Sequence, residues 1–325
     1  MNARAWVAFA AVSVLWGMPY LLLKVGMDGG MPPGFLAWAR VVLGAVTLLA
    51  LVPVKEVLAA FRGRLRWLAA FALAEVVVPY PLIAVGERHV SSSLAATLIA
   101  AAPLFVALLA RRFDAAERVG GRRLAGLLAG LGGVAALVGV DVTGRPDELL
   151  GAAALLGAAF SYAAGPMIFK RRLSDLDPRV SMAAVLVLSS VLLAPVAALD
   201  PPRAMPSGPV VVAVVVLGVL CTAVGMVWYG VLVAEAGPAR ALVITYVNPV
   251  VAVVLGVVVL SEQPGAGLAM GLPFILLGSW LSTSGPRRVP VPVASEVTAS
   301  PASATRPGAA PSGAAAAAIR AHHRS

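Results

Sequence analysis

Long apolar runs, separated by short polar or charged segments, follow one another along most of the sequence. Ten such runs can be distinguished, at about residues 5–27, 34–53, 67–85, 91–110, 121–140, 149–169, 180–199, 209–233, 238–260 and 266–284. A helix needs ~20 apolar residues to cross the ~30 Å hydrocarbon core of a bilayer, and each run is close to that length. The pattern therefore predicts an all-α integral membrane protein with ten transmembrane helices.

The runs repeat at a constant offset. Residues 146 positions apart match without a gap in seven pairs: Trp16 and Tyr162, Lys24 and Lys170, Pro32 and Pro178, Ala95 and Ala241, Pro103 and Pro249, Gly121 and Gly267, and Gly132 and Gly278. This register predicts a tandem duplication, with repeats at 1–140 and 149–285. Five spans per repeat is an odd number, so the second repeat is expected to be inverted. In transporters built this way, the substrate site lies near the midplane between the halves.

Composition and charge agree with a membrane protein. The chain is 60% hydrophobic and 12% charged, and its mean hydropathy is +0.93. The net charge of +10 does not indicate nucleic-acid binding here, because the basic residues cluster in short loops between the apolar runs. With the N-terminus inside, the inner segments hold 17 Lys and Arg residues and the outer loops hold 3. We expect a multi-pass protein of a bacterial cytoplasmic membrane with both termini cytoplasmic.

The C-terminal segment 286–325 differs in composition from everything before it. It is rich in Pro, Ala, Ser and Arg, and it has hardly any large apolar residue. Such a segment cannot bury enough apolar surface to fold, so we predict a disordered cytoplasmic tail.

The ninth run carries polar residues and a proline near its middle: Tyr246, Asn248 and Pro249. Proline lacks an N–H donor and its ring collides with the carbonyl four residues back, so a kink is expected. Pro103 is the equivalent residue of the first repeat. A polar break at mid-depth favours a path or pocket, although proline in membrane helices can also serve packing alone.

Glu75 is the most informative charged residue, because it lies near the centre of the third run. An ionised carboxylate at that depth is costly unless it is paired, protonated or facing water. It could couple transport to protons, or it could be a neutral group hydrogen-bonded between helices. Arg40, in the second run, is its expected ion-pair partner, either as a fixed brace or as a switch. The alternative for Arg40 is that it extends to the outer headgroups.

Aromatic residues gather in the runs that glycine and proline interrupt. Gly17 and Pro19 weaken the first run beside Trp16 and Tyr20. With these two aromatics we assign to a shared cavity Glu75, Tyr80, Tyr162, Trp228, Tyr229, Tyr246 and Asn248. We assign to hinges Gly17, Pro19, Pro103 and Pro249. The glycines of the fifth and tenth runs are expected to serve close helix packing. Glu87, Glu235 and Glu262 lie at the ends of runs, where we expect them to be solvated.

Motifs of several enzyme classes are absent from the sequence. It has no P-loop and no HExxH pair, and Cys221 is its only cysteine. We therefore expect no catalytic residues, no metal, no cofactor and no enzymatic activity.

Several segments resemble the EamA-domain family of the drug/metabolite transporter superfamily. They are WGMPYLLLKVG in the first run, the arginine of FLAWARVVLGAVTLL, the prolines of the fourth and ninth runs, and LSEQPGAGLAMGLPFILLGSW near the end. The resemblance covers residues 5–285. It implies ten helices in two inverted repeats, a central cavity, and export or exchange of small metabolites such as amino acids or drugs. The family's Gly-Glu-x-x-Thr-like turn keeps Glu262 here, whereas the first copy reads ARRFDAAERVGG.

The sequence therefore favours a secondary active exporter of small metabolites or drugs that works by alternating access and is coupled to protons through Glu75. A facilitative exchanger or uniporter of amino acids, a non-transporting partner protein and a lipid-modifying membrane enzyme are the alternatives. The expected partners are a small-molecule substrate and the lipid bilayer, with a homodimer left open.

Overall fold

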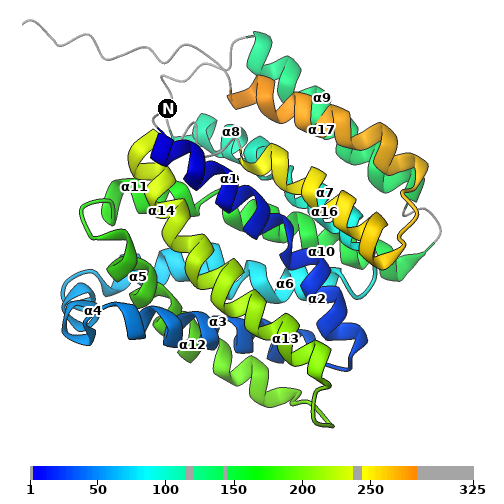
Figure 1. The fold of residues 1–325 in the computed structure, drawn as a ribbon. Helices are drawn as coiled ribbons and strands as arrows, with labels where there is room; N and C mark the ends of the chain where they lie inside the picture. Colours follow the sequence, from blue (N-terminus) through cyan, green and yellow to red (C-terminus); the bar gives the residue numbers. More distant parts are fainter. Residues whose placement is uncertain (1–2, 114–120, 142–144, 237–243, 284–325) are drawn as a thin grey trace, which may run out of the picture. The chain divides into compact units, whose positions relative to one another are not determined.

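The computed structural model of the chain describes residues 3–113, 121–141, 145–236 and 244–283. In these ranges all regular structure is helical (Figure 1). The helices in chain order are α1 (Ala3–Gly17), α2 (Pro19–Asp28), α3 (Pro33–Leu51), α4 (Val54–Phe61), α5 (Leu65–Ala72), η1 (Leu73–Val77), α6 (Pro79–Gly86), α7 (Ser92–Ile99), α8 (Ala102–Phe113), α9 (Gly121–Asp141), α10 (Pro146–Tyr162), α11 (Gly165–Arg172), α12 (Pro178–Leu199), α13 (Gly208–Val216), η2 (Leu217–Val224), α14 (Gly225–Ala236), α16 (Ile244–Leu260) and α17 (Ala266–Thr283).

Six helical segments of the described residues are long and apolar enough to cross a membrane. They are Ala3–Asp28, Pro33–Leu51, Leu65–Gly86, Pro146–Phe169, Pro178–Leu199 and Gly208–Leu232. Four shorter apolar helices accompany them, at Ser92–Phe105, Leu124–Val140, Val247–Leu260 and Ala266–Gly278. The part of the chain that the structure describes is thus all-helical, and its apolar spans are those of a multi-pass membrane protein. The predicted tail 286–325 lies outside the described residues.

Several spans are interrupted. The first run is divided where glycine and proline stand close together, because α1 ends at Gly17 and α2 begins at Pro19. The sixth run is divided in the equivalent region, between Tyr162 and Gly165. The fourth run breaks between Ile99 and Ala102, with Pro103 in the first turn of α8. Proline suits a first turn, because the N–H that it lacks would have no helical partner there.

Two spans contain π-helical turns. The segment η1 interrupts the third run at Leu73–Val77, and η2 interrupts the eighth run at Leu217–Val224. The residues equivalent to η1 in the second half, 146 positions later, all lie within η2. A π turn widens the helix and frees backbone carbonyls from their usual partners, and such turns are frequent at functional sites.

Helices from the two halves of the sequence pack against each other, and α3 and α12 run in opposite directions. In the pair α3 and α12, Gly34 lies next to Val196 and Gly44 next to Leu186. The indole Nε1 of Trp38 donates to the carbonyl of Ser190 at 3.0 Å between these two contacts. Residue numbers therefore rise along one helix as they fall along the other, which makes the pair antiparallel.

Helices α9 and α17 form a second antiparallel pair and lie side by side in Figure 1. Their backbones touch where glycine removes the side chain. A Cβ on Gly271 would lie 2.7 Å from the carbonyl oxygen of Gly133, and one on Gly278 would collide with Gly126 and Gly130. Small residues allow this close approach in membranes, so these five glycines have the packing role that the sequence suggested. A Cβ on Gly121 or Gly132 would meet nothing within 4 Å, so the prediction was wrong for these two.

The short helix α4 was not predicted, because the sequence between the second and third runs reads as a polar loop. Lys55 and Glu56 interrupt its apolar residues. The helix forms because Val57 and Ala60 lie on one face, three residues apart, and both are buried. Helix α4 packs against α12.

Candidate functional site

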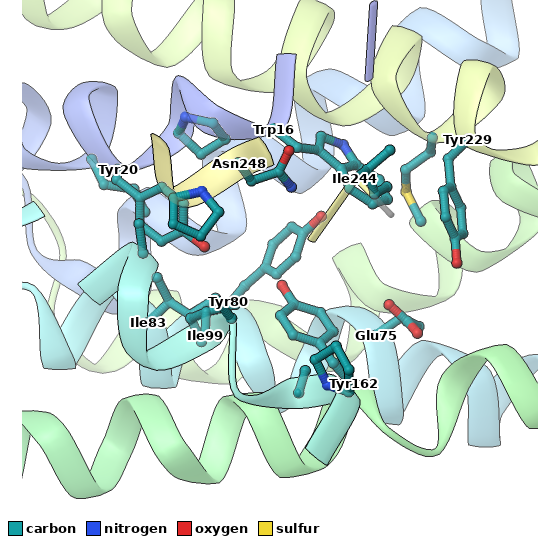
Figure 2. Close-up of a pocket in the computed structure, with 18 of the residues that line it drawn as sticks. Trp16, Tyr20, Glu75, Tyr80, Ile83, Ile99, Tyr162, Tyr229, Ile244 and Asn248 are labelled. Carbon is teal, nitrogen blue, oxygen red and sulfur yellow. The ribbon is translucent and has the colours of Figure 1, made fainter. Parts of the chain in front are cut away.

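A cavity of about 140 Å³ lies among the helices of both halves. Seven of the predicted cavity residues line it: Trp16, Tyr20, Glu75, Tyr80, Tyr162, Tyr229 and Asn248. Arg40 and the predicted hinge residues Pro19, Pro103 and Pro249 also line it. In Figure 2, the rings of Tyr80 and Tyr162 reach into the space between Asn248 and Glu75. The cavity is therefore mainly aromatic and aliphatic, with a small number of polar groups.

The lining repeats at the same offset as the sequence. Trp16 and Tyr162, Ile83 and Tyr229, and Pro103 and Pro249 are pairs separated by 146 residues, and both members of each pair line the cavity. The two halves thus contribute equivalent positions to one shared space.

The polar and charged groups do not follow this symmetry. The residue equivalent to Glu75 in the second half is Cys221, and the residue equivalent to Arg40 is Leu186. The cavity therefore has equivalent walls but an unequal distribution of charge.

Glu75 lies in η1, and its carboxylate packs directly on Gly165 at the start of α11. A Cβ at position 165 would overlap the Oε1 and Cδ atoms of Glu75. Only glycine leaves room for the carboxylate here. Among the described side chains Glu75 forms no ion pair, so its charge has no fixed cation beside it.

Arg40 has other partners than the expected Glu75. Its Nε donates to Thr222 Oγ1 at 3.2 Å, and its guanidinium carbon lies 4.0 Å from the centre of the Tyr80 ring. Arg40 is 5% exposed, so it does not extend to the headgroups. The Arg40–Glu75 ion pair is absent from the described contacts of this conformation, because the hydroxyl and the ring hold the guanidinium.

Backbone carbonyls of the two π turns accept hydrogen bonds from side chains near the cavity. Thr222 Oγ1 donates to the carbonyl of Leu217 at 2.8 Å within η2, which leaves its lone pairs for Arg40. The Trp16 indole donates to the carbonyl of Cys221, also in η2, at 3.1 Å. Ser161 Oγ donates to the carbonyl of Ala74, in η1, at 2.9 Å. Each π turn is thus held by a side chain from the other half.

Asn248 connects α16 to α1. With the side-chain amide turned so that its nitrogen faces acceptors, Asn248 donates to the carbonyls of Ile244 at 3.0 Å and Ser13 at 3.2 Å. Pro249 lies inside helix α16, whereas Pro103 lies in the first turn of α8, just after the break that follows α7. The side chain of Tyr246, a predicted cavity residue, lies outside the described part of the structure.

Trp228 does not line the cavity, in contrast to the prediction. It packs with Tyr229 against a cluster formed by Ala8, Val12, Leu232 and Ile244. Neighbouring residues on a helix point about 100° apart, so one of two adjacent aromatics turns away from the cavity. Met226 lines the cavity and was not singled out. The signal for it was its position 146 residues after Tyr80, which also lines the cavity.

At one end of the helices, Glu262 joins the two halves. Its carboxylate accepts hydrogen bonds from Ser92 N at 2.8 Å, Ser93 N at 3.1 Å and Ser93 Oγ at 2.6 Å. These are groups at the start of α7, where backbone N–H groups and the helix dipole favour an anion. Burial raises the pKa of Glu262, but the hydrogen bonds from Ser93 and Ser92 outweigh it and hold the pKa below its ordinary value.

The expectation that acidic residues at span ends are solvated was wrong for Glu87, which is fully buried. Lys24 Nζ donates to its backbone carbonyl at 3.3 Å. Both carboxyl oxygens of Glu87 lack a hydrogen-bond partner among the described residues. Burial here results from tertiary packing at the end of α6, which the position in sequence does not reveal. The side chain of Glu235 lies outside the described residues.

Comparison with sequence families gives a match over both halves. The EamA-like transporter family matches residues 4–139 and again residues 149–284. Among individual proteins, the "Uncharacterized inner membrane transporter YedA" of Escherichia coli K12 is 28% identical over 302 residues, which cover 87% of this chain and 94% of that protein.

Two further relatives have names that mention amino acids. The "Probable terminal-alkyne amino-acid exporter" of Streptantibioticus cattleyicolor is 29% identical over 88% of this chain and 92% of its own length. The "Probable amino-acid metabolite efflux pump" of Escherichia coli K12 is 26% identical over 59% of this chain and 62% of that protein. A solved structure titled "Crystal structure of protein" has the same fold, with a TM-score of 0.63, 22% identity, and coverage of 87% of this chain and 98% of that one.

Proposed function

Because this chain belongs to the EamA-like transporter family, we propose that it is a secondary active exporter of small metabolites that works by alternating access. The observation that carries the proposal is the shared cavity, which equivalent residues of both halves line. The names of the amino-acid exporter and efflux pump favour amino acids or related metabolites as substrates.

The proposed architecture is ten membrane crossings in two inverted repeats. The six long and four shorter apolar helices add up to that number. The antiparallel pairs α3 with α12 and α9 with α17 support the inversion, since each pair joins helices that the 146-residue offset relates. The distribution of Lys and Arg favours a cytoplasmic location for both termini, in the inner membrane of a bacterium.

Alternating access requires contacts between the halves that break on one side at a time. The hydrogen bonds of Glu262 with Ser92 and Ser93 are suited to this role, because they join the halves at the outer end of the proposed topology. When the cavity opens outward these three bonds are expected to break, and water can replace them at the chain surface.

Glu75 is the proposed coupling residue. It lines the cavity in a π turn and has no ion-pair partner among the described side chains. A carboxyl group inside a membrane protein is favourable only when it is protonated or when a cation lies beside the ionised form. If the proton and a cationic group of the substrate compete for Glu75, the protein exchanges one for the other. An inward proton gradient then drives export.

The test is flux in proteoliposomes that contain the purified full chain and an amino-acid substrate. We expect a pH gradient to accelerate wild-type transport and to have no effect on Glu75→Gln. Glu56→Gln is the matched control, because Glu56 is an exposed acid on α4, away from the cavity. Equal acceleration of wild type and Glu75→Gln would remove Glu75 from coupling. Wild-type flux that ignores the gradient would identify a uniporter instead.

A further inference from the structure

The buried cation Arg40 has unused hydrogen-bonding capacity. A guanidinium group carries five N–H donors. One of them, on Nε, is used for Thr222 Oγ1 at 3.2 Å. The two terminal nitrogens make no hydrogen bond to any described residue, although Arg40 is only 5% exposed and lines the cavity.

The position of this guanidinium is fixed from two sides. Thr222 holds Nε and is itself held by the carbonyl of Leu217 at 2.8 Å. The ring of Tyr80 covers one face of the guanidinium, with 4.0 Å between its carbon and the ring centre. These contacts restrict the side chain without neutralising its charge. A restrained, planar guanidinium with free terminal nitrogens is the usual protein partner for a carboxylate, which it binds through two parallel hydrogen bonds.

The described cavity lining contains one acid, Glu75, which forms no ion pair with Arg40 in this conformation. The buried Glu87, outside that lining, acts on Arg40 electrostatically and forms no described ion pair with it either. Glu75 and Tyr80 belong to one continuous span. Five residues separate them along this span, and part of that stretch is the π turn η1. Because Arg40 lies on the ring of Tyr80, its charge and that of Glu75 are expected at different levels of the cavity.

A zwitterion carries one partner for each of these two groups. The ammonium nitrogen and carboxyl carbon of an α-amino acid are ~2.5 Å apart, as in the peptide backbone. Charge-assisted hydrogen bonds of ~2.8 Å at each end extend its reach to about 8 Å between the two protein groups. Over that reach one amino acid can bridge a guanidinium and a carboxylate that line the same cavity without touching each other, as Arg40 and Glu75 do in this conformation.

The size and walls of the cavity limit the rest of the substrate. Its volume is about 140 Å³, and drug-sized ligands occupy pockets of roughly 300–1,000 Å³. The rest of the lining is mainly apolar, including Ile83, Ile99 and Met226. These features favour a small substrate with an apolar side chain.

We propose that Arg40 binds the carboxylate of the substrate and Glu75 its ammonium group, so that the substrate class is small zwitterionic α-amino acids with an apolar side chain. The inference rests on the proposed transport function of the same cavity. It extends that function by assigning recognition of the carboxylate to one residue.

Binding to the purified full chain, without any gradient, tests the assignment by calorimetry. Three probes share an isobutyl group: L-leucine carries both charges, 3-methylbutylamine lacks the carboxylate, and 4-methylpentanoate lacks the ammonium group. We expect L-leucine to bind wild type roughly ten- to a hundredfold more tightly than either analogue, the range for losing a hydrogen bond to a charged group. Equal binding of L-leucine and 3-methylbutylamine, or no binding of any probe, would overturn the proposal.

The variant series assigns the carboxylate to Arg40. In Arg40→Gln, L-leucine is expected to bind no more tightly than 3-methylbutylamine, while 3-methylbutylamine keeps its wild-type affinity. Arg179→Gln is the control, since Arg179 is an arginine at the exposed start of α12. Unchanged discrimination in Arg40→Gln would overturn the role of Arg40. If that variant does not fold, Thr222→Val tests the same point, and the proposal requires it to reduce the preference for L-leucine over 3-methylbutylamine.

Failure of this inference can be distinguished from failure of the proposed function. Carboxylate-dependent binding of L-leucine without transport in proteoliposomes contradicts the transport proposal and leaves recognition by Arg40 intact. Proton-driven export of L-leucine and 3-methylbutylamine with equal KM values supports transport and contradicts recognition by Arg40.

Discussion

The indole Nε1 of Trp16 donates to the backbone carbonyl of Cys221 at 3.1 Å, across 205 residues of sequence. The hydroxyl of Ser161 donates to the carbonyl of Ala74 at 2.9 Å in a nearly equivalent arrangement. In both cases a side chain from the first span of one half satisfies a carbonyl in the π turn of the other half. The wide turns next to the cavity are therefore stabilised reciprocally.

Replacing Trp16 by phenylalanine removes the donor and keeps most of the ring. The carbonyl of Cys221 then loses its side-chain partner, and we expect the free energy of unfolding to fall by about 1 kcal/mol. Transport should fall as well, because Trp16 lines the cavity. Thermal unfolding in detergent and proteoliposome flux measure the two effects. Trp6→Phe is the control, since Trp6 is an exposed tryptophan of the same helix. Equal stability of the two variants would contradict a structural role for the Trp16 bond.

Gly165→Ala is expected to displace Glu75, because the added methyl group would overlap the carboxylate. The pH-gradient dependence of transport should weaken although Glu75 itself is unchanged. Gly157→Ala on α10 is the matched control, because its Cβ would meet only Leu82 at 3.6 Å, an ordinary contact. The measurement is flux with and without the gradient for both variants. A Gly165→Ala protein with normal coupling would show that the position of the carboxylate is unimportant.

Glu262→Gln should weaken the connection to α7, because an amide presents one acceptor oxygen where the carboxylate presents two. We expect the free energy of unfolding to fall by on the order of 1 kcal/mol. A fully buried hydrogen bond to a charged group would contribute more, but Glu262 is partly exposed and solvent weakens the interaction. Hydrogen exchange at Ser92 and Ser93 reports the contact directly and should become faster. Gln263→Ala, one residue further on, is the control. Unchanged exchange in Glu262→Gln would contradict the contact.

The same contact predicts a dependence on pH. The pKa of Glu262 is lower in the folded protein than its ordinary value of ~4.3. The stabilisation is therefore fully present above pH ~4.3 and is lost as the pH falls through the lowered folded pKa. Wild type should lose more thermal stability than Glu262→Gln when the pH is lowered from 6 to 3. Parallel curves for the two proteins would exclude this contribution.

Gly278→Ala should destabilise the pair of α9 and α17, because a Cβ there collides with backbone atoms that cannot rotate away. Overpacking of this kind costs about 1–3 kcal/mol. Gly132→Ala changes the residue equivalent to Gly278 in the first half, where a Cβ meets nothing within 4 Å. It should leave stability unchanged or raise it slightly, since alanine favours helix over glycine. Thermal unfolding compares the two, and equal loss in both would contradict the packing argument.

Apolar periodicity and spacing predict much of this fold, because each membrane span must satisfy its own backbone. The run at 34–53 corresponds closely to α3, and the register of Trp16 with Tyr162 anticipated two residues that line one cavity. The π turns could not be predicted, because they depend on partners such as Ser161 that lie far away in sequence. The burial of Glu87 escaped for the same reason.

The candidate site was accessible to sequence reasoning only in part. Aromatic residues near glycine and proline led to Tyr80 and Tyr229, and a charge at mid-span led to Glu75. Which of two neighbouring aromatics faces the cavity depends on helix rotation, and this is why Trp228 was misplaced. The partner of Arg40 depends on a hydroxyl in another span, and charge pairing alone pointed to Glu75 instead of Thr222.

Each π turn contains one residue more than an α turn. If a π turn shifts along its span by one position, the residue that it passes turns about the helix axis by about 100°. Glu75 lies in one of these segments and Thr222 in the other. The acid and the hydroxyl that supports Arg40 can thus be re-aimed within the bilayer while both ends of their spans stay anchored at the water interface.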